Sequence, residues 1–158
     1  MAKKEKKTKN VEIVNRKAAY EYQFLQEIEA GIKLTGTEIK SIRAGNANLK
    51  DAYCMFIKGE ELIVRSMFIA EYKYGTIHNH ETRQDRKLLL KKLELKKLHR
   101  RVKEKGQTIV PYKLYISERG FAKLLIVLAQ GKKSYDKRNA IKERENKRDL
   151  NRLNKIKL

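Results

Sequence analysis

Positive charge is concentrated in three separate segments of this 158-residue chain, and the sequence between them is almost neutral. Residues 1–10 carry +4, residues 83–105 carry +8 and residues 132–158 carry +7, which together account for +19 of the total charge of +20. The remaining sequence therefore has the charge balance of an ordinary folded core. We expect one folded domain over residues 11–131, a basic N-terminal arm over 1–10 and a basic tail over 132–158.

Short segments of alternating polarity in the near-neutral sequence predict β-strands. Alternation runs from Tyr20 through Leu34, where the first strand is expected. Two further pairs of strands, each joined by a short loop with a glycine, are expected at 52–57 with 62–67 and at 109–116 with 122–129. Short strands with too little sequence between them for parallel crossovers favour a mainly β fold with flanking helices (α+β). The expected architecture is a small closed antiparallel barrel of the oligonucleotide-binding type, with a ferredoxin-like sheet as the alternative.

Helical spacing predicts two helices inside this domain. The shorter helix covers Thr37 to Ala44, and Gly45 suits the left-handed position that follows a helix. The longer helix covers 86–105, and one apolar stripe of it is expected to pack on the barrel. The members of the stripe are Leu88, Leu95, Leu98 and Val102.

The other side of the longer predicted helix carries leucines framed by cations. We expect Leu90 and Leu93 to contact the core, whereas Leu89 is a candidate exposed contact to an RNA base or sugar. Arg86 and Lys87 precede these leucines and are candidates for contacts with RNA phosphates.

The tail has few apolar residues and cannot bury much surface. Within it, Glu143 and Lys147 attract each other at a spacing of four residues, whereas Arg144 and Arg148 repel at the same spacing. A free helix would be marginal, and contact with a polyanion would remove the repulsion. We therefore expect the tail to be disordered in the free protein and helical when bound.

The single cysteine, Cys54, lies in an apolar run, where we expect a buried free thiol. One cysteine allows no internal disulfide and no paired Cys-x-x-Cys metal site. No apolar stretch of a signal peptide follows the basic N-terminus, and no segment approaches the roughly 20 apolar residues of a membrane span. The sequence predicts a cytoplasmic protein without a membrane partner.

Groups suited to catalysis are few. His78 and His80 flank Asn79, which raises the alternative of a metal-dependent nuclease, but they lack the spacing and the second ligand set of such a site. Candidates for general acid–base catalysis are Glu27, Glu29 and Glu38, yet no activating neighbour or nucleophile motif accompanies them. We expect no catalytic activity, no metal, no cofactor and no small-molecule substrate.

Structured RNA is the partner that the composition favours. A pI near 10.0 attracts polyanions, and the tail lacks the Trp and Phe that anchor helices on membranes. Tyrosines among Lys and Arg provide rings that stack on unpaired bases and cations that meet phosphates. Tyr53 and Tyr115 are the exceptions, since we expect these two rings to pack in the core.

Several motifs in order resemble the small protein B family, the SsrA-binding (tmRNA-binding) proteins of bacterial ribosome rescue. The resemblance covers nearly the whole chain. It rests on Asn15–Ala18, Glu29–Gly31 with Leu34–Arg43, Arg86–Leu90, Lys105–Thr108 with Val110–Pro111, and Gly131–Arg138 with Ile141–Arg144.

This resemblance implies an oligonucleotide-binding-type barrel that grips the tRNA-like part of tmRNA and carries it to the decoding site of a stalled ribosome, without catalysis. The positions similar to the family's tmRNA contacts are Asn15, Lys17, Glu29, Leu89 and Lys123. Those similar to its ribosome-acting junction are Gly131, Lys132, Lys133, Tyr135, Asp136, Lys137 and Arg138. The chain departs from the family at Tyr135, which stands where histidine is common; because tyrosine also stacks, we expect function to be kept. The alternative function is a structural protein whose basic arms sit permanently in ribosomal RNA.

Overall fold

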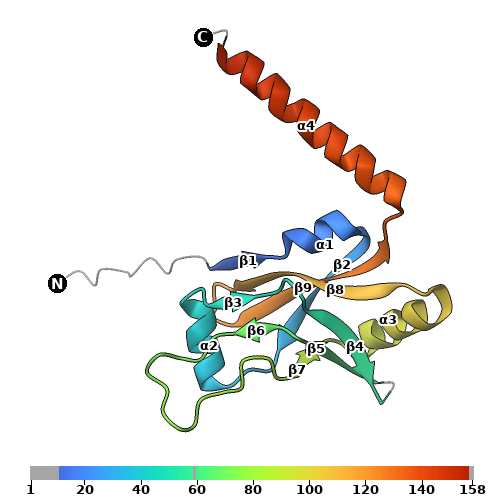
Figure 1. Ribbon diagram of the computed structural model, residues 1–158. Helices are drawn as coiled ribbons and strands as arrows, with labels where there is room; N and C mark the ends of the chain where they lie inside the picture. The colour runs from blue at the N-terminus through green and yellow to red at the C-terminus, as the bar shows by residue number, and fades with distance from the viewer. Residues whose placement is uncertain (1–10, 59, 157–158) are drawn as a thin grey trace.

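The computed structural model describes residues 11–58 and 60–156, so the predicted basic arm over 1–10 lies outside the described residues. Thirteen elements follow one another along this part of the chain (Figure 1). They are β1 (Glu12–Val14), α1 (Arg16–Glu21), β2 (Tyr22–Ile32), α2 (Gly36–Arg43), β3 (Ala47–Asn48), β4 (Tyr53–Ile57), β5 (Glu61–Arg65), β6 (Phe68–Ile69), β7 (Arg86–Leu89), α3 (Lys92–Lys105), β8 (Thr108–Ile116), β9 (Ala122–Gly131) and α4 (Ser134–Ile156).

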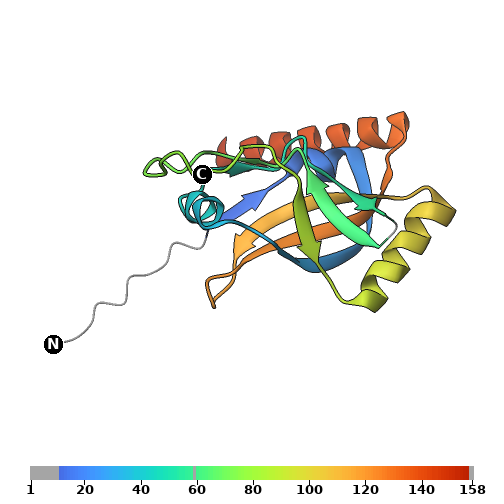
Figure 2. The same cartoon turned by 90° about the horizontal axis from the view of Figure 1, so that it is seen from below.

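Six strands form a hydrogen-bonded ring, which can be followed in Figures 1 and 2. Around the ring the order is β8, β4, β5, β7, β2 and β9, and the pairing of β9 with β8 closes it. All of these pairings are antiparallel, while β1 adds to the edge of β8 and β3 pairs with β6 separately. The predicted strand pairs β4–β5 and β8–β9 are confirmed, and the ring differs from the open sheet of the ferredoxin-like alternative.

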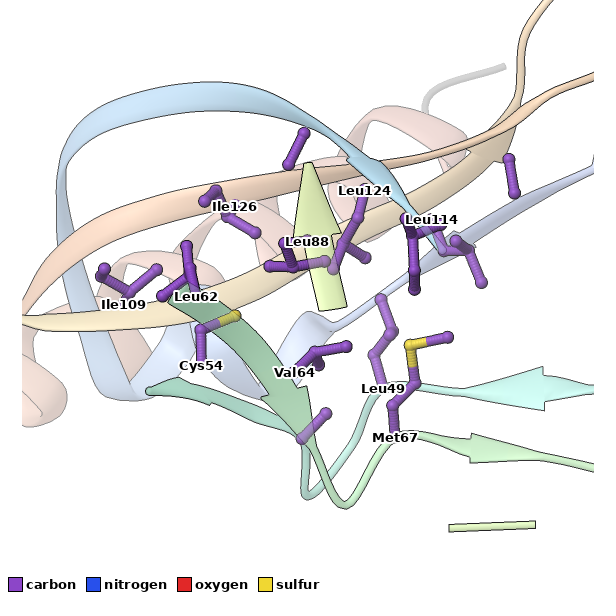
Figure 3. Close-up of a cluster of buried hydrophobic side chains, with 14 of the residues drawn as sticks. Leu49, Cys54, Leu62, Val64, Met67, Leu88, Ile109, Leu114, Leu124 and Ile126 are labelled. Carbon is purple, nitrogen blue, oxygen red and sulfur yellow. The ribbon is translucent and has the colours of Figure 1, made fainter. Parts of the chain in front are cut away.

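Aliphatic side chains fill the interior of the ring (Figure 3). Leu62 and Val64 of β5, Leu88 of β7 and Ile126 of β9 are almost fully buried in one cluster. Cys54 lies among them as a free buried thiol, as expected, and its pKa is raised because burial disfavours the thiolate. The interior is therefore a packed apolar core. Polar contacts with a partner must come from side chains on the outside of the ring.

The predicted long helix over 86–105 is wrong in its first third, because residues 86–89 form strand β7. Burial alternates along β7: Arg86 and Leu88 are buried, whereas Lys87 and Leu89 are exposed. This alternation has the two-residue period of a strand. Helix α3 begins after Lys91, whose backbone N–H donates a hydrogen bond to the Glu94 carboxylate at 3.0 Å. Leu98 is buried as expected, whereas Leu93 is 82% exposed, so its predicted core contact is also wrong.

The strand expected to run from Tyr20 to Leu34 begins later than its alternation of polarity suggested. Tyr20 lies in the short helix α1, and β2 starts at Tyr22. The prediction that Tyr53 packs in the core is wrong, since its side chain is 42% exposed on β4. By contrast, α2 agrees with the helix expected at 37–44, and Gly45 has the positive φ of 81° predicted for it.

The tail forms one continuous helix, α4, which leaves the ring and points into solvent (Figure 1). None of its described residues is buried. The sequence predicted a disordered tail in the free protein, and the structure differs from that expectation. Helix formation is favoured because the segment contains neither Gly nor Pro and is rich in Lys and Arg, whose intrinsic helix propensities are high.

Candidate nucleic-acid interface

One face of the ring displays a row of side chains from four neighbouring strands. In this row Leu89 of β7 lies opposite Gly31 of β2, Gly31 lies opposite Lys123 of β9, and Lys123 lies opposite Tyr115 of β8. Directly paired residues point to the same side of a sheet, so the row belongs to one outer surface. We call this surface the outer face. Three residues that the sequence placed far apart are thereby brought together: Leu89, Lys123 and, two positions before Gly31, Glu29.

A carboxylate with two donors sits at the centre of the outer face. Glu29 accepts a hydrogen bond from the Lys123 ammonium on one oxygen and from the Tyr115 hydroxyl on the other. The hydrogen bond from Lys123 holds the pKa of Glu29 below its usual value, and the bond from Tyr115 adds to the effect. Partial burial and the Glu29 charge raise the pKa of Tyr115 to about 12. Glu29 is therefore a fixed anion at neutral pH, and Tyr115 is a fixed donor rather than the core residue that was expected.

Leu89 is 53% exposed beside this polar group, in agreement with the exposed position predicted for it. Gly31 makes room for it: a Cβ at Gly31 would lie 3.3 Å from the Leu89 Cβ, tighter than most side-chain contacts. A larger residue at position 31 would push the leucine outward. The glycine therefore sets how Leu89 is presented to a partner.

An open pocket of about 640 Å³ continues the outer face toward the β8–β9 hairpin. Glu29, Tyr115 and Lys123 line one side of it, and Lys113, Arg119 and the exposed ring of Phe121 line other parts. Rings and cations together are the side chains that stack on bases and neutralise phosphates. Lys113, Arg119 and Phe121 were not among the RNA contacts predicted from the sequence. The alternation of Lys113 with the apolar Leu114 indicated that Lys113 lies on the outside of a strand. No local pattern in the sequence linked Arg119 and Phe121, at the tip of the hairpin, to Glu29.

Arg86 does not belong to this surface, so its prediction as an RNA contact is corrected. Its side chain is only 1% exposed, and its Nε donates a hydrogen bond to Glu38 Oε1 at 2.6 Å. Its Nη1 donates to the Met67 carbonyl at 2.6 Å and to the Gln84 carbonyl at 3.0 Å. A buried arginine needs such partners, and none of its donors is left for a phosphate. Arg86 holds α2 and the loop before β7 onto the ring.

Asn15, which was also predicted as an RNA contact, stabilises the fold through hydrogen bonds to the backbone. Its Oδ1 accepts a hydrogen bond from the Ala18 N–H and caps α1, while its Nδ2 donates to the Leu49 and Pro111 carbonyls at 3.0 and 3.2 Å. The side chain is buried, so it fixes the start of α1 and with it Lys17.

The two remaining predicted cations are exposed and lie in weak ion pairs. Lys17 Nζ is 3.8 Å from Glu21 Oε1 and 3.9 Å from Asp51 Oδ1, and Lys87 Nζ is 2.7 Å from Glu61 Oε1. Exposed pairs of this kind contribute little to stability, so both lysines remain accessible to phosphates.

The predicted junction with the tail lies at the far end of β9. The Lys132 N–H donates a hydrogen bond to the Glu21 carbonyl, and its Nζ donates to the Ala19 carbonyl, which ties the start of the tail to α1. The Lys133 carbonyl accepts hydrogen bonds from the N–H groups of Asp136 and Lys137 as α4 begins. Asp136 lies in the first turn, where a negative charge favours the helix. Of the residues predicted at this junction, Gly131, Lys133, Tyr135 and Arg138 are exposed.

The histidine pair is divided between interior and surface. His78 is exposed, whereas His80 is buried, with Nδ1 2.9 Å from Thr37 Oγ1 and Nε2 3.2 Å from the Ile69 carbonyl. Within residues 11–58 and 60–156, no group of three His, Cys, Asp or Glu side chains is arranged to hold a metal ion. Across the same residues no helix is long and apolar enough to cross a membrane.

Comparisons with known proteins identify the family of this chain. A family model described as SmpB protein matches residues 12–156. The SsrA-binding protein of Parabacteroides distasonis is 52% identical over 149 residues, covering 94% of this chain and 97% of the relative. The SsrA-binding protein of Bacteroides thetaiotaomicron is 53% identical over 147 residues, covering 93% and 97%.

A solved structure matches as well. It is described as "tmRNA-SmpB: a journey to the center of the bacterial ribosome", and one of its chains matches with a TM-score of 0.65 and 45% identity. The match covers 78% of this chain and 86% of that chain. With a family model over nearly its whole length and relatives above 50% identity, this chain belongs to the SmpB protein family.

Proposed function

We propose that this chain binds the tRNA-like part of tmRNA on its outer face and delivers it to stalled ribosomes in trans-translation. The observation that carries the proposal is the convergence of Leu89, Glu29 and Lys123, which lie on three different strands and meet in one row. Membership in a family whose relatives are named for SsrA binding supports the same partner. The strand ring serves in this proposal as a barrel of the oligonucleotide-binding type, acting in the cytoplasm.

Each group on the outer face has a distinct part in holding RNA. Leu89 offers an apolar contact to a base or sugar, and Glu29 accepts hydrogen bonds from base amino groups or ribose hydroxyls. Lys123, Lys17 and Lys87 meet phosphates. Because Glu29 is already ionised and both its oxygens accept hydrogen bonds, it serves recognition and not proton transfer. The proposed work is therefore binding and delivery, without a chemical step.

The tail is proposed to act on the ribosome. In α4, residues 134–156 span about 35 Å at 1.5 Å per residue, which is long enough to follow an mRNA channel away from the ring. Tyr135 would stack in the decoding region, while Asp136, Lys137 and Arg138 fix the start of the helix there. Lys132 and Lys133 would contact ribosomal RNA beside Gly131. The three-part division of the chain, with 1–10 as a basic arm, remains part of this proposal.

A truncation tests the division of labour. A chain ending at Gly131 should bind a transcript of the tRNA-like part of tmRNA within a few-fold of the full chain, because α4 buries no residue against the ring. The same truncated chain should fail to release stalled ribosomes. Loss of small-RNA binding on truncation would contradict the role of the outer face, and full rescue activity would contradict the role of the tail.

The identity of co-purified RNA separates this proposal from a structural ribosomal protein. The full chain is expected to purify with one small stable RNA. Retention on large ribosomal subunits through a high-salt wash would instead support a permanent place in ribosomal RNA.

A further inference from the structure

The outward side of α3 carries more positive charge than its place in the fold requires. Residues 92–105 contain seven basic and two acidic side chains, a net charge of +5. Leu98 is buried, and Leu95 and Val102 pack against the core, so α3 covers one end of the ring (Figures 1 and 2). Packing thus accounts for the apolar side of the helix and leaves the basic side facing solvent.

Three lysines form a row on that basic side. At 100° per residue, Lys92, Lys96 and Lys103 fall within about 40° of one another, on the opposite side of the helix from Leu98. All three are exposed, and among the described residues none of them has a carboxylate within ion-pair distance. Lys92 and Lys96 are also four residues apart, where like charges destabilise a helix. A polyanion laid along the row would remove this repulsion.

The position of α3 in the fold indicates which polyanion would bind the lysine row. Helix α3 ends at Lys105, and β8 then begins at Thr108, which is paired with Ala129 near the end of β9. The tail starts at Lys132, three residues beyond Ala129, so α3 and the tail junction share one end of the ring. Lys123 and Tyr115 lie toward the other end of β8, roughly 20 Å away at 3.3 Å per residue.

We propose that the Lys92, Lys96 and Lys103 row is a second RNA-binding surface, which holds ribosomal RNA phosphates next to the place where the tail enters. This inference rests on the proposed function, since it assigns the ribosome to one end of the ring and the tRNA-like RNA to the outer face. The row extends about 16 Å along the helix, a length suited to several phosphates of one backbone. Leu93, exposed beside the row, adds an apolar contact to the same partner.

The test changes Lys92, Lys96 and Lys103 to Gln in the full chain, which removes charge and keeps good helix formers. A matched control changes Lys40, Lys73 and Arg83 to Gln, three exposed basic residues on α2 and on the segment between β6 and β7, away from α3 (Figure 1). Three lost phosphate contacts should weaken binding to small ribosomal subunits by about tenfold or more and lower the salt slope by about 2 to 3. Binding to the tRNA-like transcript should stay within about twofold, and the control should resemble the parent in both assays. The corresponding triple change to Arg should bind as the parent does.

Three results would overturn the proposal. The first is ribosome binding by the Gln variant that equals the control. The second is a loss confined to the tRNA-like transcript, which would place the row on the same RNA as the outer face. The third is weakened binding to subunits with unchanged binding to a transcript of small-subunit ribosomal RNA, which would identify a protein partner. Failure of the parent chain to bind the tRNA-like transcript would contradict the proposed function instead. The ribosome-binding assay would still test whether the lysine row on α3 binds ribosomal RNA.

Discussion

Two glutamate–cation pairs of similar composition have opposite roles because one is buried and the other is not. The side chains of Glu38 and Arg86 are each 1% exposed, between α2 and β7. Those of Glu29 and Lys123 are 46% and 39% exposed, between β2 and β9. The polar atoms of a buried pair must find all their hydrogen-bond partners inside the protein, whereas those of an exposed pair can also bond to a partner molecule. Burial, rather than residue type, therefore separates the structural pair from the candidate RNA contact.

The largest effect should follow from breaking the interior pair. Changing Arg86 to Ala leaves the Glu38 carboxylate uncompensated, and we expect the free energy of unfolding to fall by about 3 to 5 kcal/mol. Urea denaturation measures this loss. The matched change of Lys123 to Ala should cost less than about 1 kcal/mol, because its pair is solvated. Equal losses for the two variants would break the comparison.

A smaller but clear effect on RNA binding is expected at Leu89. Changing Leu89 to Ala removes apolar surface that the RNA would bury, so affinity for the tRNA-like transcript should fall by about tenfold. The slope of log affinity against log salt should hardly change, because no charge is lost. Leu93 to Ala is the control, since that leucine is also exposed but lies on α3. Parent-like binding by the Leu89 variant would rule out the apolar contact.

The exposed cation Lys123 should contribute to the salt dependence of RNA affinity. Changing Lys123 to Gln removes one phosphate contact and should lower the salt slope for the tRNA-like transcript by about 0.7 to 0.9. Fluorescence titrations over a range of salt concentrations measure the slope. An unchanged slope would mean that Lys123 is fully occupied by Glu29 and does not reach the RNA.

The smallest effect is expected from pH. The pKa of Glu29 is lowered by Lys123, so any binding contributed by its charge is present above its usual value of 4.5 and is lost only as pH falls through the lower folded value. The pKa of Tyr115 is raised to about 12, so its hydroxyl keeps its proton well into the alkaline range. Affinity for the tRNA-like transcript should therefore be flat between about pH 6 and 8. A step in that interval would show that another group controls the outer face.

Local patterns predicted the parts of this fold that are defined by neighbouring residues. The β4–β5 and β8–β9 pairs and helix α2 with Gly45 were predicted because turn residues and alternation lie within a few positions of one another. The boundary between β7 and α3 was missed for a similar reason. A run of leucines at 88–90 satisfies both the strand and the helix period, and only pairing with β2 and β5 decides between them.

The role of a charged side chain was harder to predict, because its partner is distant in sequence. Arg86 meets Glu38 across 48 residues, and nothing local distinguishes it from exposed Lys87. Glu29 and Lys123 are 94 residues apart and meet only because β2 pairs with β9. The sequence resemblance identified both of them, and strand register supplies the physical reason that they act together.

Closure of the strand ring has a consequence for aggregation. Every strand of the ring has hydrogen-bonded neighbours on both sides, whereas an open sheet exposes unpaired N–H and C=O groups along its edges. Such edges recruit strands of other chains, a hazard for a protein that must stay dispersed until an RNA partner arrives. Within the described part of the chain, β9 is paired with both β2 and β8 along nearly its whole length and offers little edge for β-sheet extension, and the high net charge adds mutual repulsion between copies. A purified sample without RNA should therefore remain monomeric at low salt, so that its surfaces are free when the RNA is added.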